Sequence, residues 1–201
     1  IILISPHAPI NRDAFQIACC GEASGDFARF GAAHVALSMA IDEELGAAVE
    51  RQAKRRGLSA VLEADSVTLD HGALVPLSFL IGDGQRKPDL LLLSISGLSA
   101  QSHARYGDAV RAAIEETGRR VVLVASGDLS HHLSKNGPYG ATAEGPLFDK
   151  RVMKILGDGE LSELFSFTDS FADAAGECAL RPLQILAGVL GQDLLIPEVL
   201  S

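Results

Sequence analysis

The sequence predicts an α/β fold: a single three-layer domain with a central, mostly parallel or mixed sheet flanked by helices. Three short apolar runs, at residues 1–4, 90–93 and 121–124, each stop abruptly at small or polar residues. Such runs are typical of strands that are buried on both faces beneath covering helices. In open α/β sheets ligands bind beyond the carboxyl ends of the strands, so functional residues are expected there.

Two of the expected helices have clear ends. The segment 42–56 begins with three acidic residues and ends with three basic residues before Gly57, which suits the helix dipole at both ends. The segment 102–117 repeats apolar side chains along one face and is closed by Gly118. Both segments are therefore predicted to be helices.

Two more helices are indicated by proline near their starts. Proline is favoured in the first turn, so helices are expected over 146–156 and from Pro182 to about Leu190. The glycine-rich loop 135–140 lies before the first of these and is long enough to cover a site.

Composition limits the class of protein. With 201 residues, 47% of them hydrophobic, residues 1–201 can form one domain with a full core. No apolar run reaches the roughly 18 residues of a membrane span, and the net charge of −9 comes with no basic stripe, so neither membrane nor nucleic acid is expected as a partner. Cys19 and Cys20 are adjacent and Cys178 is distant, which fits no disulfide framework and predicts a cytoplasmic location.

Three of the six histidines have surroundings that suggest chemistry. His7 follows Pro6 at the end of the first apolar run, and His131 follows the third run with Asp128 three residues before it. His34 and His103 have no polar neighbours and are expected to be structural or surface residues, which is the commoner role of a single histidine.

The third histidine, His71, lies between Asp70 and Gly72, and two interpretations are open. Asp70 can cap the amino terminus of a helix. Alternatively, Asp70 can orient His71 towards a substrate oxygen by fixing its tautomer. In either case Gly72 lets another group approach closely.

Glu177 lies among small residues, between Gly176 and Cys178. It can be a glutamate in the first turn of a helix, favoured by the helix dipole. It can also be a buried carboxylate, which must be paired or bind a metal. The presence of three candidate histidines favours a His and carboxylate metal site with open coordination positions.

Six motifs in this order resemble the LigB-type class III extradiol dioxygenase superfamily. The closest resemblance is to its bacterial and archaeal branch associated with the AmmeMemoRadiSam system, which is similar to Memo proteins. The motifs are Ser-Pro-His-Ala-Pro at 5–9, Gly-Asp-Phe at 25–27 with Arg-Phe-Gly at 29–31, Leu-Asp-His-Gly-Ala-Leu-Val-Pro-Leu at 69–77, Ala-Ser-Gly-Asp-Leu-Ser-His at 125–131, Gly-Pro-Tyr-Gly at 137–140 and Gly-Glu-Cys at 176–178.

The resemblance implies a LigB-like catalytic domain that holds one non-haem Fe(II). In such enzymes two histidines and a glutamate bind the iron, and His7 matches the second histidine and Glu177 the carboxylate. The first ligand histidine lies in a Pro-His-Pro strand upstream of Ile1, so residues 1–201 are expected to lack the amino-terminal strand and helix of the domain. His131 matches the histidine that acts as acid and base, His71 the histidine that contacts a substrate hydroxyl, and Asp128 lies in the same pocket in the Memo branch.

The leading expectation is an enzyme that cleaves a small catechol-type aromatic ring with O2. Two histidines and one carboxylate leave positions for both catechol oxygens and O2 on one metal, and His131 can take up and return a proton. The alternative is a Memo-like metal-binding or redox protein without ring cleavage, favoured by Cys178 beside Glu177. A zinc hydrolase is a third interpretation. Zinc and copper are accordingly the alternatives to iron, and a homodimer is left open.

Overall fold

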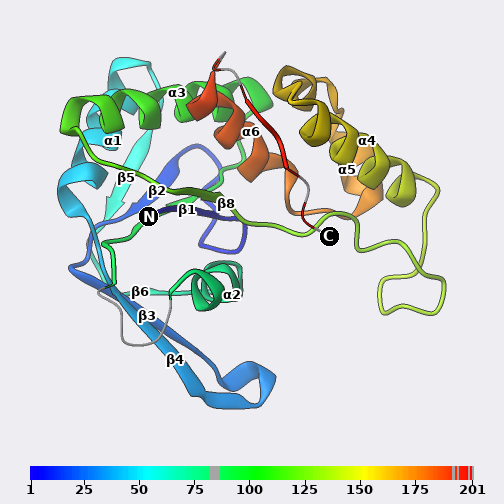
Figure 1. Ribbon diagram of the computed structural model, residues 1–201, viewed down its shortest axis with the longest axis horizontal. Coiled ribbons are helices and arrows are strands. Elements are labelled where there is room, and N and C mark those ends of the chain that lie inside the picture. The colour runs from blue at the N-terminus through cyan, green and yellow to red at the C-terminus, as the bar shows by residue number, and fades with distance from the viewer. Residues whose placement is uncertain (82–86, 192, 194, 199, 201) are drawn as a thin grey trace.

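The computed structural model describes residues 1–81, 87–191, 193, 195–198 and 200, and they form three layers (Figure 1). The central sheet has five strands in the order β5-β2-β7-β1-β8. Strand β1 pairs in parallel with β7 and with β8, whereas β2 runs antiparallel to β7 and parallel to β5. The predicted α/β fold with a mixed sheet is confirmed. The strands are β1 (Ile2–Ser5), β2 (Phe15–Ala18), β5 (Ala60–Glu63), β7 (Leu91–Ser94) and β8 (Leu123–Ala125).

Helices cover both faces of the sheet (Figure 1). One face packs against α1, α3 and α6, and the other against α2. A further group, α4, η2 and α5, packs beside α6 around its own apolar cluster. The helices are α1 (Glu43–Arg55), α2 (His71–Leu80), α3 (Ala100–Thr117), α4 (Glu144–Asp158), η2 (Leu161–Ser166), α5 (Asp169–Ala175) and α6 (Leu180–Leu190).

A second, small sheet lies on the α2 side of the molecule. Its three strands have the order β4-β3-β6, and β3 and β4 form a hairpin that projects from the body (Figure 1). The exposed His34 lies on this hairpin. The elements are β3 (Glu22–Phe27), the short helix η1 (Ala28–Phe30), β4 (Ala32–Ala40) and β6 (Val67–Thr68).

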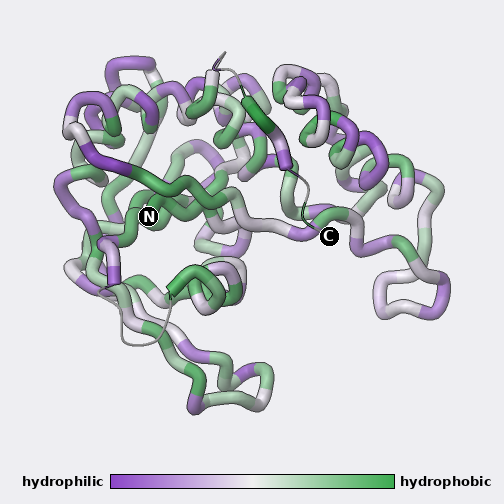
Figure 2. The backbone as a smooth tube through the Cα atoms, viewed as in Figure 1, coloured by the Kyte–Doolittle hydropathy of each residue, from purple (hydrophilic) through white to green (hydrophobic). Residues whose placement is uncertain are grey.

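Strand β1 lies at the centre of the core. Ile2, Leu3 and Ile4 are 0% exposed, and alternation sends Ile2 and Ile4 to the α1–α3 side and Leu3 to the α2 side. The apolar colour concentrates along these inner strands in Figure 2, and polar residues lie on the outer turns of the helices. The first apolar run of the sequence is thus buried on both faces, as predicted.

The helix predictions hold with small shifts at the ends. Asp42 caps α1 by accepting a hydrogen bond from the backbone N–H of Leu45 at 3.1 Å. Helix α3 begins two residues earlier than predicted because the Ser99 hydroxyl caps it, and α4 likewise begins ahead of Pro146, at Glu144.

The third apolar run requires a correction. The predicted strand at 121–124 is wrong in its position, since β8 covers only Leu123–Ala125. It is also wrong that this strand is buried on both faces, because β8 is an edge strand with β1 as its one neighbour and Val122 is 57% exposed. An edge strand is paired on one side and covered less completely than a central one.

No helix within the described residues is both long and apolar enough to cross a membrane.

His103 is a buried structural residue of α3, and its two ring nitrogens have different partners. The Nδ1–H group donates to the Ser99 carbonyl at 2.9 Å, and Nε2 accepts the backbone N–H of Ser96 at 3.3 Å. Since Nε2 must accept, the neutral imidazole fits this position. Burial lowers the pKa of His103 from 6.5 to about 4.

Stability should therefore fall as the pH drops from about 6.5 to about 4, because the unfolded chain takes up a proton at His103 that the folded chain does not. Across this window the loss attributable to His103 is about 3 kcal/mol at most. Urea denaturation at pH values near both ends measures it. A His103→Gln variant should lose less over the same window, and His34→Gln should lose as much as the parent protein; equal losses in all three would contradict the assignment.

Candidate functional site

The end of β1 and the start of α2 bring His7 and His71 together. Their rings stack with centroids 4.2 Å apart and an interplanar angle of 25°. Asp70 caps α2 by accepting the backbone N–H groups of Gly72 and Ala73 at 2.7 and 3.3 Å, and the Ser5 hydroxyl donates to the same carboxylate oxygen at 2.7 Å. The Asp70 carboxylate therefore joins the last residue of β1 to the first turn of α2.

Asp70 acts as a helix cap, as the first of the two interpretations predicted. Its capping oxygen is Oδ1, while Oδ2 is buried without a hydrogen-bond partner in the described part of the chain. At Gly72 an added Cβ would lie 2.8 Å from Ser5 Oγ and 3.3 Å from His7 Cδ2. Glycine is needed there because Ser5 and His7 approach the helix so closely.

The loop after β8 supplies Asp128 and His131. The two side chains face each other, with His131 Nε2 3.4 Å from Asp128 Oδ2. The ring of Tyr139, from the loop predicted to cover a site, has its centroid 5.5 Å from that of His131. This loop thus lies against the predicted acid–base histidine.

Two loop segments, 128–132 and 174–178, hold each other through hydrogen bonds, and we call this pair the loop clamp. The backbone N–H of His131 donates to the Gly176 carbonyl at 3.1 Å, and the N–H of Cys178 donates to the Asp128 carbonyl at 3.1 Å. The Ser130 hydroxyl donates to the Ala175 carbonyl at 2.6 Å. The clamp fixes the backbone around both candidate motifs.

His132 belongs to the clamp and not to the group around His131. Its Nδ1 is 3.0 Å from the Ala174 carbonyl oxygen. An added Cβ at Gly176 would lie 2.8 Å from the His132 ring, and Gly176 has a φ of 62°. Glycine is favoured at this turn for both reasons.

Cys178 connects the two groups of candidate residues. Its Sγ accepts the backbone N–H of Asp128 at 3.1 Å and lies 3.8 Å from His7 Nε2. One ligand atom each from Asp128, His131 and Cys178 lie within 4.8 Å of one another. In the sequence Cys178 favoured the Memo-like alternative through its place beside Glu177, but its contacts with Asp128 and His7 were not predicted.

Glu177 lies beside this group and caps α6. Its Oε2 accepts the backbone N–H of Leu180 at 2.6 Å. Burial raises the pKa of this carboxyl, and the hydrogen bonds to Leu180 and Ala179 oppose that rise. A carboxylate can accept on both oxygens, so the hydrogen bond from Leu180 leaves Glu177 able to bind a metal. Metal binding by Glu177 stays a prediction.

The protonation of His7 and Cys178 reflects their partial burial. Burial lowers the pKa of His7, and the neighbouring His71 lowers it further. Burial also raises the pKa of the Cys178 thiol. A pKa below the ordinary value of 6.5 favours the neutral imidazole near neutral pH, and neutral imidazole is the form of histidine that binds metals.

The donor set fits a transition-metal ion. Ligands on one ion are about 2.0 to 2.3 Å from it, which places them within roughly 4.6 Å of one another. The separation of 3.8 Å between His7 Nε2 and Cys178 Sγ meets this limit. One ligand atom each from Asp128, His131 and Cys178 lie within 4.8 Å of one another, which is close to it. Imidazole, carboxylate and thiolate together suit iron, zinc or copper.

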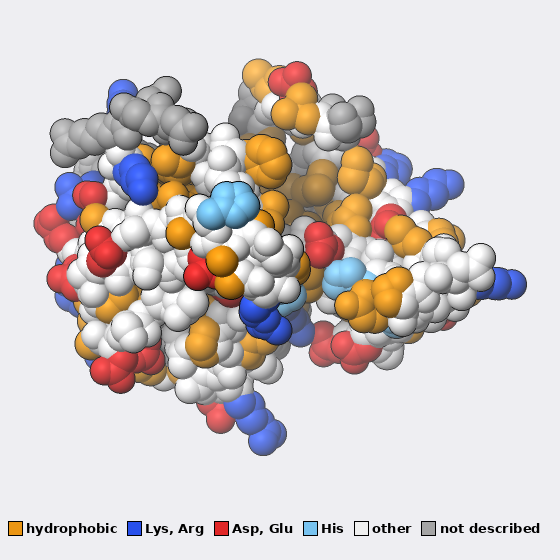
Figure 3. Space-filling view, turned by 90° about the horizontal axis from the view of Figure 1, so that it is seen from below, with side chains coloured by type: hydrophobic (Ala, Val, Ile, Leu, Met, Phe, Trp, Pro, Cys, Tyr) orange, Lys and Arg blue, Asp and Glu red, His pale blue; other side chains and the backbone are white. Residues whose placement is uncertain are grey.

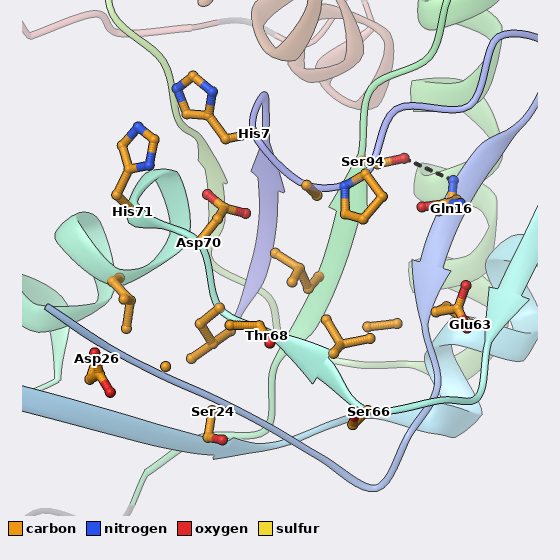
Figure 4. A pocket seen from close by; sticks show the side chains of 18 of the residues that line it. His7, Gln16, Ser24, Asp26, Glu63, Ser66, Thr68, Asp70, His71 and Ser94 are labelled. Carbon is orange, nitrogen blue, oxygen red and sulfur yellow. Dashed lines mark hydrogen bonds between the residues drawn. The ribbon is translucent and has the colours of Figure 1, made fainter. Parts of the chain in front are cut away.

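A cavity of about 890 Å³ opens beside the two stacked histidines. It lies between the central sheet and the small sheet, with His7, His71 and Asp70 at one end (Figure 4). Viewed from below, this side of the molecule is hollowed between two bulges, and histidine and acidic side chains lie near the hollow (Figure 3). The volume is in the upper part of the range of roughly 300–1,000 Å³ found for small-molecule sites.

The structure thus brings four predicted residues into one region, His7 with His71 and Asp128 with His131, and links the pairs through Cys178. Glu177 adjoins Cys178 along the chain.

Comparison with known proteins identifies the family. The family described as the catalytic LigB subunit of aromatic ring-opening dioxygenase matches residues 1–201. Protein CA_C1420 of Clostridium acetobutylicum is 34% identical over 209 residues, which cover 100% of this chain and 44% of that protein. The chain therefore spans less than half the length of this relative.

Two further relatives are dioxygenases by name. The 3,4-dihydroxyphenylacetate 2,3-dioxygenase of Escherichia coli is 26% identical over 209 residues, covering 96% of this chain and 74% of the relative. The 2,3-dihydroxyphenylpropionate/2,3-dihydroxicinnamic acid 1,2-dioxygenase of Rhodococcus globerulus is 29% identical over 150 residues, covering 72% and 43%. Because the family model matches this chain over residues 1–201, the chain belongs to the LigB family of aromatic ring-opening dioxygenases.

Proposed function

We propose that this chain catalyses the extradiol cleavage of a catechol-type ring with O2, dependent on Fe(II). The observation that supports this most is the stack of the motif histidines His7 and His71 in the lining of a cavity, with the pair Asp128 and His131 linked to His7 through Cys178. In such a reaction both atoms of O2 enter the product and one ring C–C bond beside the hydroxylated carbons breaks. No external reductant is needed.

His7 and Glu177 are the proposed protein ligands of an iron, which would supply open coordination positions for the substrate and O2. The stack of His71 on His7 holds the His71 ring at the mouth of the cavity, where its nitrogens can hydrogen-bond a substrate hydroxyl. His131 takes a proton from a substrate hydroxyl and returns it when the ring opens, and Asp128 orients the His131 ring.

His131→Ala should lower turnover by roughly two to four orders of magnitude, the usual contribution of a positioned proton-transfer group. Iron content should stay nearly unchanged, because His131 is assigned to substrate and not to the metal. The measurement is oxygen uptake with a panel of small catechols after anaerobic reconstitution with Fe(II), alongside metal analysis.

His34→Ala, on the exposed hairpin, is the matched control and should behave as the parent protein. Loss of iron from His131→Ala would make His131 a ligand and His71 the next candidate for the base. Retention of both iron and activity would rule out the proposed mechanism.

One observation favours a second candidate, a Memo-like metal-binding or redox protein that does not cleave rings. Cys178 Sγ lies 3.8 Å from His7 Nε2 and shares a potential ligand group with Asp128 and His131, whereas the Glu177 carboxylate accepts the backbone N–H of Leu180. A thiolate favours softer metals such as copper. The two candidates therefore differ in which residue of the pair 177–178 holds the metal.

Two nearly isosteric substitutions separate these candidates. Glu177→Gln keeps the capping oxygen but removes the charge, and should weaken Fe(II) binding by roughly tenfold or more, since even residues behind metal ligands contribute that much. Cys178→Ser should leave Fe(II) binding nearly intact. Anaerobic calorimetry with Fe(II) measures both, and the reverse order, with copper binding lost in Cys178→Ser, would support the redox protein instead.

The remaining functional assignments extend this proposal. A small aromatic substrate and O2 are the proposed partners, and the homodimer that the sequence left open stays untested. Cys19, Cys20 and Cys178 are free thiols, which supports the proposal of a reducing, cytoplasmic location.

A further inference from the structure

Phe30 is an exposed aromatic residue in the lining of the cavity. It is 65% exposed and is the last residue of the short helix η1. Its ring centroid lies 6.0 Å from that of His71, with an interplanar angle of 62°. His71 stacks in turn on His7, and all three residues line the cavity. Single exposed apolar residues are common on protein surfaces, but this one continues a row of rings along the cavity.

The turn that carries Phe30 is shaped by its own sequence. The pairing of β3 with β4 shifts its register between Asp26 and Phe27, and irregularities of this kind often re-aim side chains beside active sites. The Asp26 carboxylate accepts the backbone N–H of Ala28 at 2.7 Å, just before η1. Gly31 ends η1 with a φ of 80°, a conformation that favours glycine. Phe30 is thus held in a defined turn.

The strand before this turn is tied to the segment before His71. The backbone N–H of Leu69 donates to the Ser24 carbonyl of β3 at 2.9 Å. At Gly25 an added Cβ would lie 2.4 Å from the Leu69 carbonyl oxygen, so the two backbones touch there. Figure 4 shows Asp26 of β3 below His71. The two segments that present Phe30 and His71 to the cavity are therefore held together.

Packing within the protein does not explain why Phe30 is exposed there. Phe27, whose ring centroid is 6.2 Å away, packs against the apolar cluster on the α2 side of the sheet. Phe30 belongs to none of the apolar clusters of the described residues. A phenylalanine ring left in water forgoes the gain of burying it. A second ring that packs on Phe30 from the cavity supplies that burial.

We propose, on the basis of the proposed function, that Phe30 contacts the substrate and selects for an aromatic ring. The catechol ring packs on the Phe30 ring, edge-to-face or offset, with its hydroxyl groups towards His7 and His71. The centroid distances of 4.2 and 6.0 Å along this row keep Phe30 within reach of one ring bound beside the histidines. Phe30 has no group that transfers a proton or binds a metal, so it contributes to substrate binding and orientation.

Anaerobic calorimetry with unsubstituted catechol, with and without added Fe(II), tests the contact independently of turnover. Phe30→Ala should weaken catechol binding about two- to tenfold, the range for an aromatic pair. Phe30→Leu should lose as much, whereas Phe30→Tyr keeps an aromatic face and should keep the affinity. Fe(II) affinity should stay unchanged in all three variants, because Phe30 acts on the substrate and not through His7.

Phe79→Ala is the matched control. Phe79 is 86% exposed on α2, the helix that begins with His71, but it lies outside the cavity lining. This variant should bind catechol and Fe(II) as the parent protein does. Where O2 is consumed, Phe30→Ala should raise KM by about the factor lost in binding and change kcat less.

The outcomes separate this inference from the proposed ring cleavage. If catechol binds in a manner that depends on Phe30 but no O2 is consumed, ring cleavage fails and the contact stands. The contact is overturned if the parent protein does not bind catechol, or if Phe30→Ala binds it as tightly as the parent protein. It is also overturned if Phe79→Ala loses as much affinity, or if Phe30→Ala loses Fe(II) binding to the same extent, which would indicate a structural role.

Discussion

The parallel register of β1 with its two neighbours is the constraint on which the site depends. Ser5 is level with Ser94 of β7, and Ile4 is level with Ala125 of β8. The backbone N–H of Ser126 donates to the Ile4 carbonyl at 3.1 Å, which continues the pairing one residue past β8. The three strands therefore end at one edge of the sheet, and the segments that follow β1 and β8 leave the core side by side. A shift of one residue in either pairing would turn the side chains of a strand to its opposite face.

Much of the fold could be predicted from the sequence because its inner strands are almost purely apolar. Strands β1 and β7 match the predicted runs closely, and α1 is marked at both ends by charge. Strands β2 and β5 were not predicted, and the polar residues Gln16 and Glu63 explain why. Both side chains line the cavity, and they interrupt the apolar pattern by which a buried strand is detected.

The histidines could be predicted because each follows a local pattern of strand end, proline, acid or glycine. The contact between Cys178 and His7 could not, because it joins residues 171 positions apart and depends on how the loop after β8 meets the loop before α6. Glu177 is not in the first turn of a helix, as one of its two interpretations predicted: it precedes α6 and accepts the backbone N–H of Leu180 from outside the helix. Local capping is readable from a sequence, whereas the relative placement of two loops requires the folded chain.

The loop clamp connects His131, the proposed proton-transfer group, to the residues beside Glu177, the proposed metal ligand. His131 is held by the Gly176 carbonyl, and Cys178 is held by the Asp128 carbonyl. At Gly127 an added Cβ would lie 2.5 Å from Ala179 Cα, so the backbones of the two loops are in direct contact there. Substitutions in the two loops should therefore combine non-additively in stability, as expected for residues that share one hydrogen-bond network. Variation in one loop is consequently constrained by the residues present in the other.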